Sequence, residues 1–319
     1  MTHEPDRTLP SIGGIAVTDV NAVLGAILWV VLIVGFGLGA IKRALALAPL
    51  VLVPLGLGLA ATPRFAGLAG KLYTAAIVCQ PVAAMLFAGS LVVDGDTLAA
   101  AMAASWLAVA ALLAFAAVTR TFERGPWPLS ETVIDAGLAY TVVGAAALVL
   151  SHLEVTLWFS PVIVLLTAVH FHYAGFVLPV TTGLVGRCGT TDAAVYRPLA
   201  GVVAVGPALI AVGISFSPLV EVVTVGLFTV AVAILGGYVA VRLAPTRSRL
   251  QGPLLAASAL ALPVSMLLAL AYGVTAFTGN GFTGLSISRM VSLHGTLNAF
   301  GFGLLATVGW RLSVPAQNE

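Results

Sequence analysis

Ten long apolar runs constrain this chain more than any other feature. Each run is long enough to cross the hydrocarbon core of a membrane as a helix of about 20 residues, and the runs are continuous rather than alternating. Because only helices and closed barrels satisfy every backbone polar group in lipid, the sequence predicts an all-α, polytopic integral membrane helical bundle. The ten predicted segments are approximately 22–41, 44–61, 72–92, 97–118, 131–151, 158–180, 198–216, 219–241, 253–276 and 286–310.

No joint between the runs is long enough to hold a soluble domain, so we expect one transmembrane domain over 22–311, with short tails at 1–21 and 312–319. Acidic residues precede the first run and no A-x-A-like site follows it, which favours a retained anchor over a cleaved signal peptide.

The composition excludes a soluble globule. Only 8% of the residues are charged and 60% are hydrophobic, whereas a soluble domain carries roughly a quarter charged residues. The formal net charge is +2 and the basic residues are scattered, which gives no face for a nucleic acid. Two cysteines form neither a disulfide framework nor a C-x-x-C site. Membrane lipid is therefore the main expected partner.

The basic residues divide unequally between the two sides of the predicted bundle. Of the 14 Lys and Arg residues, all but Lys42, Arg43 and Arg289 fall on the side of the two termini. Because cytoplasmic loops are enriched in basic residues, we expect both termini in the cytoplasm.

The sixth and tenth segments, which run in the same direction, resemble one another. One offset aligns three pairs: His170 over His294, Phe176 over Phe300 and Arg187 over Arg311. The second segment ends in a similar way but has no histidine. This spacing predicts a pseudo-repeat of four helices.

Ionisable side chains inside a membrane span are costly and mark functional candidates. Three of the five histidines, His170, His172 and His294, fall at lipid depth, and Asn298 shares a helix face with His294. Carboxylates are absent from the middle of the spans. We expect Glu131 and Asp135 to complement the N-terminus of the fifth helix.

Helix geometry restricts how the histidines meet. His170 and His172 are two residues apart, about 200° around an ideal helix, so both serve one site only if the helix is distorted. Otherwise one faces the site and the other bonds a neighbouring helix. His170 and His294 lie at similar depth. Imidazoles without carboxylates suit zinc, copper or haem iron. The alternative is that these side chains are interhelical hydrogen-bonding groups in a packed bundle.

The motifs HFHYAGF in the sixth segment and LHGTLNAFGFG in the tenth resemble those of the YndJ-like family of prokaryotic membrane proteins. The resemblance implies a multi-pass protein of a prokaryotic plasma membrane. Members of that family are occasionally labelled as transporters.

The H-G-x-x-N-x-x-G-F run beginning at His294 is similar to histidine-bearing helices of haem-copper oxidase subunit I and NnrS-like proteins. This likeness implies His170, His172 and His294 as haem or metal ligands. The second segment lacks the histidine expected there, and the tenth lacks an H-x-H pair, which leaves a reduced site with one haem or one metal.

Three functional hypotheses remain. The first is an intramembrane site for haem or a transition metal (Cu, Zn or Fe) at His170, His172 and His294, with Asn298 and Tyr173 orienting an imidazole or a bound ligand. The second is a small-solute transporter or channel in which these histidines line the pathway. The third is a sensor or assembly factor without turnover. None assigns a catalytic residue.

Overall fold

The computed structural model of the protein describes residues 9–61, 65–189, 193–279 and 284–315. Within these ranges ten helical segments are long and apolar enough to cross a membrane, which confirms the predicted polytopic helical architecture. Six of these segments are single helices: α1 (Val17–Phe36), α4 (Gly67–Ser90), α5 (Asp96–Arg124), α6 (Leu129–His152), α9 (Ala193–Phe216) and α11 (Gln251–Thr278).

The other four segments contain tighter or wider turns. Their parts are α2 (Ala40–Leu47), η1 (Ala48–Leu52) and α3 (Val53–Ala60); α7 (Pro161–His172), η2 (Tyr173–Val177) and α8 (Leu178–Arg187); α10 (Pro218–Tyr238), η3 (Val239–Leu243) and η4 (Ala244–Thr246); and α12 (Ile287–Met290), η5 (Val291–Gly295), η6 (Leu297–Leu304) and α13 (Leu305–Leu312). All of the η turns are π-helical except η4, which is a 3₁₀ turn.

The helix bounds differ from the predicted runs at polar ends. α1 begins at Val17 because Asp19 is paired within the protein, and it ends where Gly37 adopts a left-handed conformation (φ 60°). α5 continues to Arg124 because its polar last turn is also paired. A short hairpin of β1 (Ser11–Ile12) and β2 (Ile15–Ala16), which the apolar runs do not predict, precedes α1.

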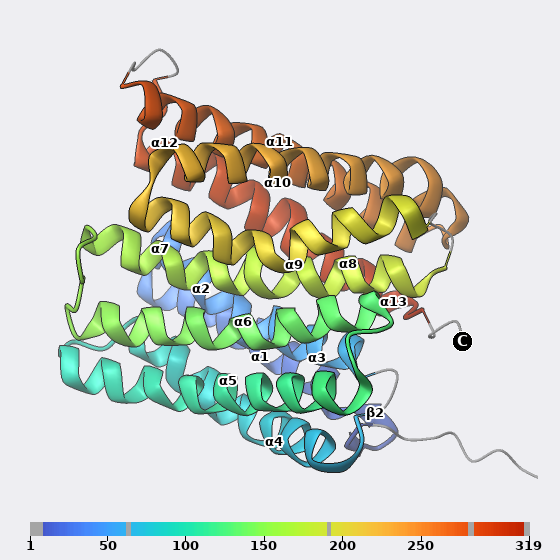
Figure 1. Ribbon diagram of the computed structural model, residues 1–319. Helices are drawn as coiled ribbons and strands as arrows, with labels where there is room; N and C mark the ends of the chain where they lie inside the picture. Colours follow the sequence, from blue (N-terminus) through green and yellow to red (C-terminus); the bar gives the residue numbers. More distant parts are fainter. Residues whose placement is uncertain (1–8, 62–64, 190–192, 280–283, 316–319) are drawn as a thin grey trace, which may run out of the picture.

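Both tails lie partly outside the described residues. These are residues 1–8 and 316–319, and Arg7 and Arg64 of the orientation argument fall outside as well. The described start of the chain at β2 and its C-terminal end lie at the same end of the bundle in Figure 1. We name this the inner end, and the opposite end, where α7 and α12 begin, the outer end.

Three segments from distant parts of the chain pack against one another. We name 40–60, 161–187 and 287–312 the central segments. The first is the most enclosed, with 89% of its most apolar window buried. A Cβ on its Gly56 would lie 2.6 Å from the ring of Phe176, and one on Gly303 would lie 2.9 Å from the ring of Tyr173. Small residues thus let the three backbones approach closely, as expected in a membrane bundle.

The remaining helices surround this centre in the order that a four-helix repeat predicts. α4, α5 and α6 pack in succession and α6 packs on α7 and α8, while α9, α10 and α11 pack in succession and α11 packs on η6 and α13 (Figure 1). α1 packs on η1 and α3, as the last two helices of a shorter third unit would. The aligned residues Phe176 and Phe300 both contact this shorter unit: Phe176 lies against Gly56 of α3, and Phe300 lies against Trp29 of α1.

Candidate functional site

His170 and His294 meet in the outer half of the bundle, as their similar depth predicts. Their ring centroids are 6.0 Å apart and the ring planes are inclined by 31°. His170 is exposed and lies in the last turn of α7, whereas His294 is 9% exposed and lies in η5. We name these two side chains the histidine pair. They come from the sixth and tenth segments, so a contact across 124 positions creates the pair.

Hydrogen bonds fix the proton positions on both rings. His170 Nδ1 lies 2.7 Å from the carbonyl oxygen of Leu166 and therefore carries the proton that it donates. His294 Nδ1 lies 2.9 Å from the carbonyl oxygen of Ser265 on α11 and 2.9 Å from its hydroxyl. In both rings the lone pair consequently sits on Nε2. Such a backbone bond to the other nitrogen is typical of metal-binding histidines.

The two Nε2 atoms have different surroundings. His294 Nε2 accepts a hydrogen bond from the side-chain amide of Asn298, one turn along the same segment, at 3.0 Å. Asn298 therefore lies within hydrogen-bond distance of the His294 ring. Among the described residues, His170 Nε2 has no hydrogen-bond partner.

His172 does not join the pair. It is fully buried, its Nδ1 donates to the carbonyl oxygen of Ala168 at 2.7 Å, and its Nε2 accepts from the indole of Trp106 on α5 at 3.0 Å. Gly144 of α6 makes room for the ring, since a Cβ there would lie 2.7 Å from His172 Nδ1. The prediction of three histidine ligands in one place was therefore wrong. The 200° separation holds, and His172 bonds a neighbouring helix.

Tyr173 also lies away from the imidazoles. Its hydroxyl donates to the carbonyl oxygen of Ala44 on α2 at 2.9 Å, so it joins two central segments rather than orienting a ligand. Consistent with the placement of His172, no group of three His, Cys, Asp or Glu side chains in the described part of the chain is arranged to hold a metal ion. The histidine pair alone remains as a ligand set.

A pocket opens at the outer end above the pair. Its volume is about 610 Å³, and it is walled by the α1–α2 joint at 36–42, by residues 91–94, and by Leu165 and Val291. Leu165 precedes His170 by five residues and Val291 precedes His294 by three. We name this cavity the outer pocket.

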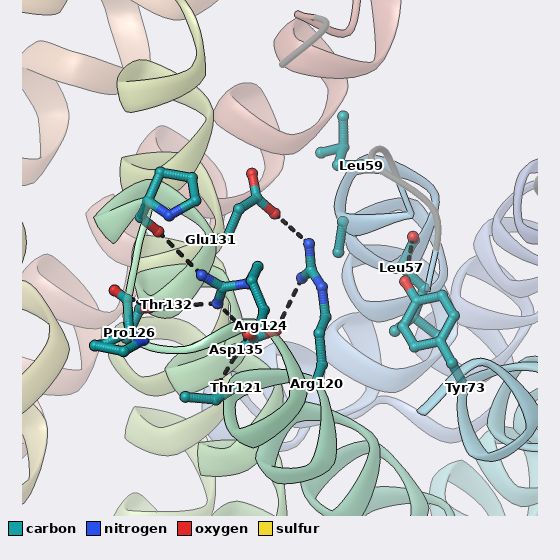
Figure 2. Close-up of polar contacts among 12 residues, drawn as sticks. Leu57, Leu59, Tyr73, Arg120, Thr121, Arg124, Pro126, Glu131, Thr132 and Asp135 are labelled. Atoms are coloured by element: carbon teal, nitrogen blue, oxygen red, sulfur yellow. Dashed lines mark hydrogen bonds and ion pairs between the residues drawn. The ribbon is translucent and has the colours of Figure 1, made fainter. Parts of the chain in front are cut away.

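The inner half contains a buried group of charges. We name Arg120, Arg124, Glu131, Asp135 and Arg187 the inner charge network. Figure 2 labels its members other than Arg187. The carboxylate of Glu131 is fully buried and receives two hydrogen bonds from Arg187, at 2.7 and 2.8 Å, and one from Arg120. The other Nη of Arg187 donates to the carbonyl oxygen of Leu59 at 2.8 Å, which ties α8 and α6 to the end of α3.

Asp135 completes this network. It accepts from Arg120 at 2.8 Å, from Arg124 at 2.9 Å and from the hydroxyl of Thr121 at 3.0 Å (Figure 2). The expectation that Glu131 and Asp135 serve the helix N-terminus was therefore incomplete, because arginines counted as joint charges lie inside helices and pair with them. Their placement at one predicted membrane side was the signal that could have revealed the network.

A second ion pair closes the same end beside the network. Arg311, which aligns with Arg187 in the repeat, donates twice to Asp19 of α1, at 2.6 Å each. A Cβ on Gly58 would lie 3.6 Å from the Arg311 guanidinium, so this pair also sits against α3. Both aligned arginines thus fasten a central segment at its inner end.

Comparisons with known proteins agree with the motif-based resemblance. A family described as YndJ-like protein matches residues 43–302. A Bacillus subtilis (strain 168) relative, named "Uncharacterized membrane protein YndJ", is 31% identical over 238 residues. The alignment covers 74% of this chain and 42% of that relative, so the chain spans less than half of the relative's length. No solved structure matches the chain. The extent of the family match, together with the ten spanning helices, shows that this multi-pass membrane protein belongs to the YndJ-like family.

Proposed function

We propose that the chain binds one transition-metal ion between His170 and His294, inside the outer half of the membrane domain. The observation that carries the proposal is the 6.0 Å separation of the two ring centroids. An ion bound by two imidazole nitrogens at about 2.0–2.1 Å places the ring centres about 6 Å apart when the two bonds are nearly opposite. Binding then requires the two rings to turn their Nε2 atoms toward one point between them.

The donor set supports an ion that prefers nitrogen. Both rings carry their proton on Nδ1, which leaves Nε2 as the lone-pair atom. Imidazoles without a carboxylate suit copper, zinc or iron rather than calcium or magnesium. Binding at His294 would displace the amide of Asn298, a single hydrogen bond on a side chain that can rotate. Two protein ligands leave further positions open for water or a small ligand.

Haem is the less supported form of this proposal. A bis-imidazole haem needs similar ring separation, but it also needs a flat slot for the macrocycle between the rings. The outer pocket, which is large enough to hold part of such a group, is lined by neither histidine. The experiment below therefore includes haemin as one of its probes.

The test uses the full chain in lipid nanodiscs, titrated separately with Cu⁺, Zn²⁺ and haemin. We expect one metal ion per chain, with binding weakened by about tenfold or more in His170→Ala and His294→Ala, at least the size of loss seen when a metal site's supporting contacts are removed. His152→Ala is the matched control, because His152 contacts Ser90 at the outer end and lies outside the pair.

Equal binding by wild type and both pair variants would overturn the proposal, as would the absence of binding by any probe. An absorption band with haemin that depends on both histidines, without binding of free ions, would replace the ion by haem.

A second candidate is transport of a small solute. The π-helical turns in all three central segments favour it, because such turns are frequent at functional sites and irregular helices line transport pathways. Solute flux into proteoliposomes that His294→Ala abolishes, in metal-free protein, would support this candidate over the first.

A further inference from the structure

We infer that the ion reaches the histidine pair from the outer end, through the outer pocket, and that ion pairs close the inner end of the central segments. This inference rests on the proposed function and adds the route and its sidedness. It assigns Leu165 and Val291 as the residues that line the passage between pocket and pair.

The position of the pocket carries the first step. Leu165 and Val291 belong to the two segments that bear the histidines, and both face the cavity. At a rise of about 1.5 Å per residue, the five residues from Leu165 to His170 span about 7.5 Å. His294 follows Val291 by three residues, less than one turn. Measured along the two helices, the pocket wall therefore lies roughly one turn outward of both histidines.

The exposure of His170 carries the second step. It is the tenth residue of the 161–187 segment, where polar groups are normally enclosed, yet its side chain is exposed. The His170 ring is therefore accessible from outside the protein. The pocket at the outer end of the same helix is the cavity nearest to it along the chain.

The pocket wall carries one charge of each sign, on Lys42 and Asp94. The Lys42 ammonium donates to the carbonyl oxygen of Leu91 at 2.7 Å, which fixes its position in the wall. Asp94 forms no ion pair within the ranges that the structure describes. A carboxylate at the mouth of a low-dielectric cavity raises the local concentration of cations.

The inner end offers no comparable route. Arg187 links Glu131 of α6 to the last carbonyls of α3, and Arg311 of α13 pairs with Asp19 of α1, so each of the three central segments is bonded to another helix there. Tyr173 packs on Gly303 between this closure and the histidine pair. An ion entering from the cytoplasmic side would have to part these contacts.

The experiment places one cysteine at a time in a background without the native thiols (Cys79→Ala, Cys188→Ala). Val291→Cys and Leu165→Cys line the pocket. Leu293→Cys is the matched control, since Leu293 is 49% exposed, lies beside His294 and is absent from the pocket wall. Arg249→Cys reports the inner end. Each variant, in oriented proteoliposomes, is treated with a charged, membrane-impermeant methanethiosulfonate, and Cu⁺ and Zn²⁺ uptake is then timed.

We expect the pocket cysteines to react from the side opposite Arg249→Cys, and their modification to slow metal association by about tenfold or more, within the range over which association rates of related complexes vary. Modification of Leu293→Cys should leave the rate unchanged.

Three outcomes would overturn the inference. They are reaction of the pocket cysteines from the Arg249 side, unchanged association after their complete modification, and slowing only when a lipid-soluble thiol reagent modifies Leu293→Cys, which would indicate a lateral entrance. If wild-type protein bound no ion before any modification, the proposed metal binding itself would be contradicted. The failure of the route and the failure of the binding proposal are therefore distinguishable.

Discussion

The inner and outer halves of this bundle use their polar side chains in opposite ways. In the inner half, Arg187 and Glu131 are almost fully buried and every hydrogen-bonding atom of the Arg187 guanidinium faces an acceptor. In the outer half, His170 is exposed and retains an unpartnered nitrogen within the described part of the protein. Buried charges need complete pairing, whereas a neutral imidazole tolerates an open lone pair. The difference indicates that the inner half holds the bundle together and the outer half is available to a ligand.

The two histidines of HFH repeat this contrast within one turn. His172 is enclosed by Trp106, Phe87 and Gly144, and both of its ring nitrogens are bonded. His170 instead contacts the ring of His294, with the two ring centroids 6.0 Å apart. A single sequence motif thus contains a packing residue and a ligand candidate, and the predictions below test that division.

The largest effect is expected from Arg187→Met. The change leaves the buried carboxylate of Glu131 with Arg120 alone and removes the donor to Leu59. Removing one partner of a buried pair costs about 3–5 kcal/mol. The free energy of unfolding, measured by SDS titration of the purified protein in mixed micelles, should fall accordingly. A loss below about 1 kcal/mol, the value typical of an exposed pair, would contradict the inner half's structural role.

Trp106→Phe should have the next largest effect. The indole N–H is the donor to His172 Nε2, and its removal leaves a fully buried acceptor unsatisfied. Such a group costs on the order of 1–3 kcal/mol. The same unfolding titration measures it, with Trp158→Phe as the control, because Trp158 is 63% exposed. Metal binding by the histidine pair should persist in the Trp106 variant, and its loss would show that His172 belongs to the site.

Arg311→Met tests whether the aligned arginines are equivalent. The Arg311 and Asp19 side chains are 29% and 27% exposed, so solvent screens this pair more than the Arg187 pair. We expect a loss of at most about 1 kcal/mol in the free energy of unfolding, as for partly exposed ion pairs. A loss equal to that of Arg187→Met would mean that both arginines carry the closure of the inner end equally.

The architecture was predictable from sequence because lipid imposes one requirement on every span. Continuous apolar runs had to become helices, and the ten of them did. The depth of His170 and His294 was also readable, since it depends only on helix rise. Hydropathy failed at the polar ends: Arg120 looks like a joint charge, but it lies inside α5, where it pairs with Asp135.

The orientation of His172 could not be derived in the same way. Which of two histidines on opposite helix faces turns toward α5 depends on where a neighbour lacks a side chain. Gly144 provides that space beside His172, and Trp106 provides the donor. Both residues lie on other helices, and neither forms a motif with HFH. The depth of the motif in the membrane could be predicted from the sequence, but the partner of each histidine could be assigned only from the packed structure.

The smallest effect is expected from Gly295→Ala, next to His294. A Cβ there would have one neighbour within 4 Å, the carbonyl oxygen of Met290 at 3.9 Å, so the outer half has room for it. Because Ala is a better helix former than Gly by up to about 1 kcal/mol, the free energy of unfolding should stay the same or rise slightly. Gly301→Ala, two turns inward on the same segment, is the control: its Cβ would lie 2.9 Å from the Cβ of Ala261, which cannot rotate away. Overpacking there should cost about 1–3 kcal/mol. If the two glycines tolerated alanine equally, the central segment would be as loosely packed at Gly301 as beside the histidine pair, and the contrast between the halves would rest on charge alone.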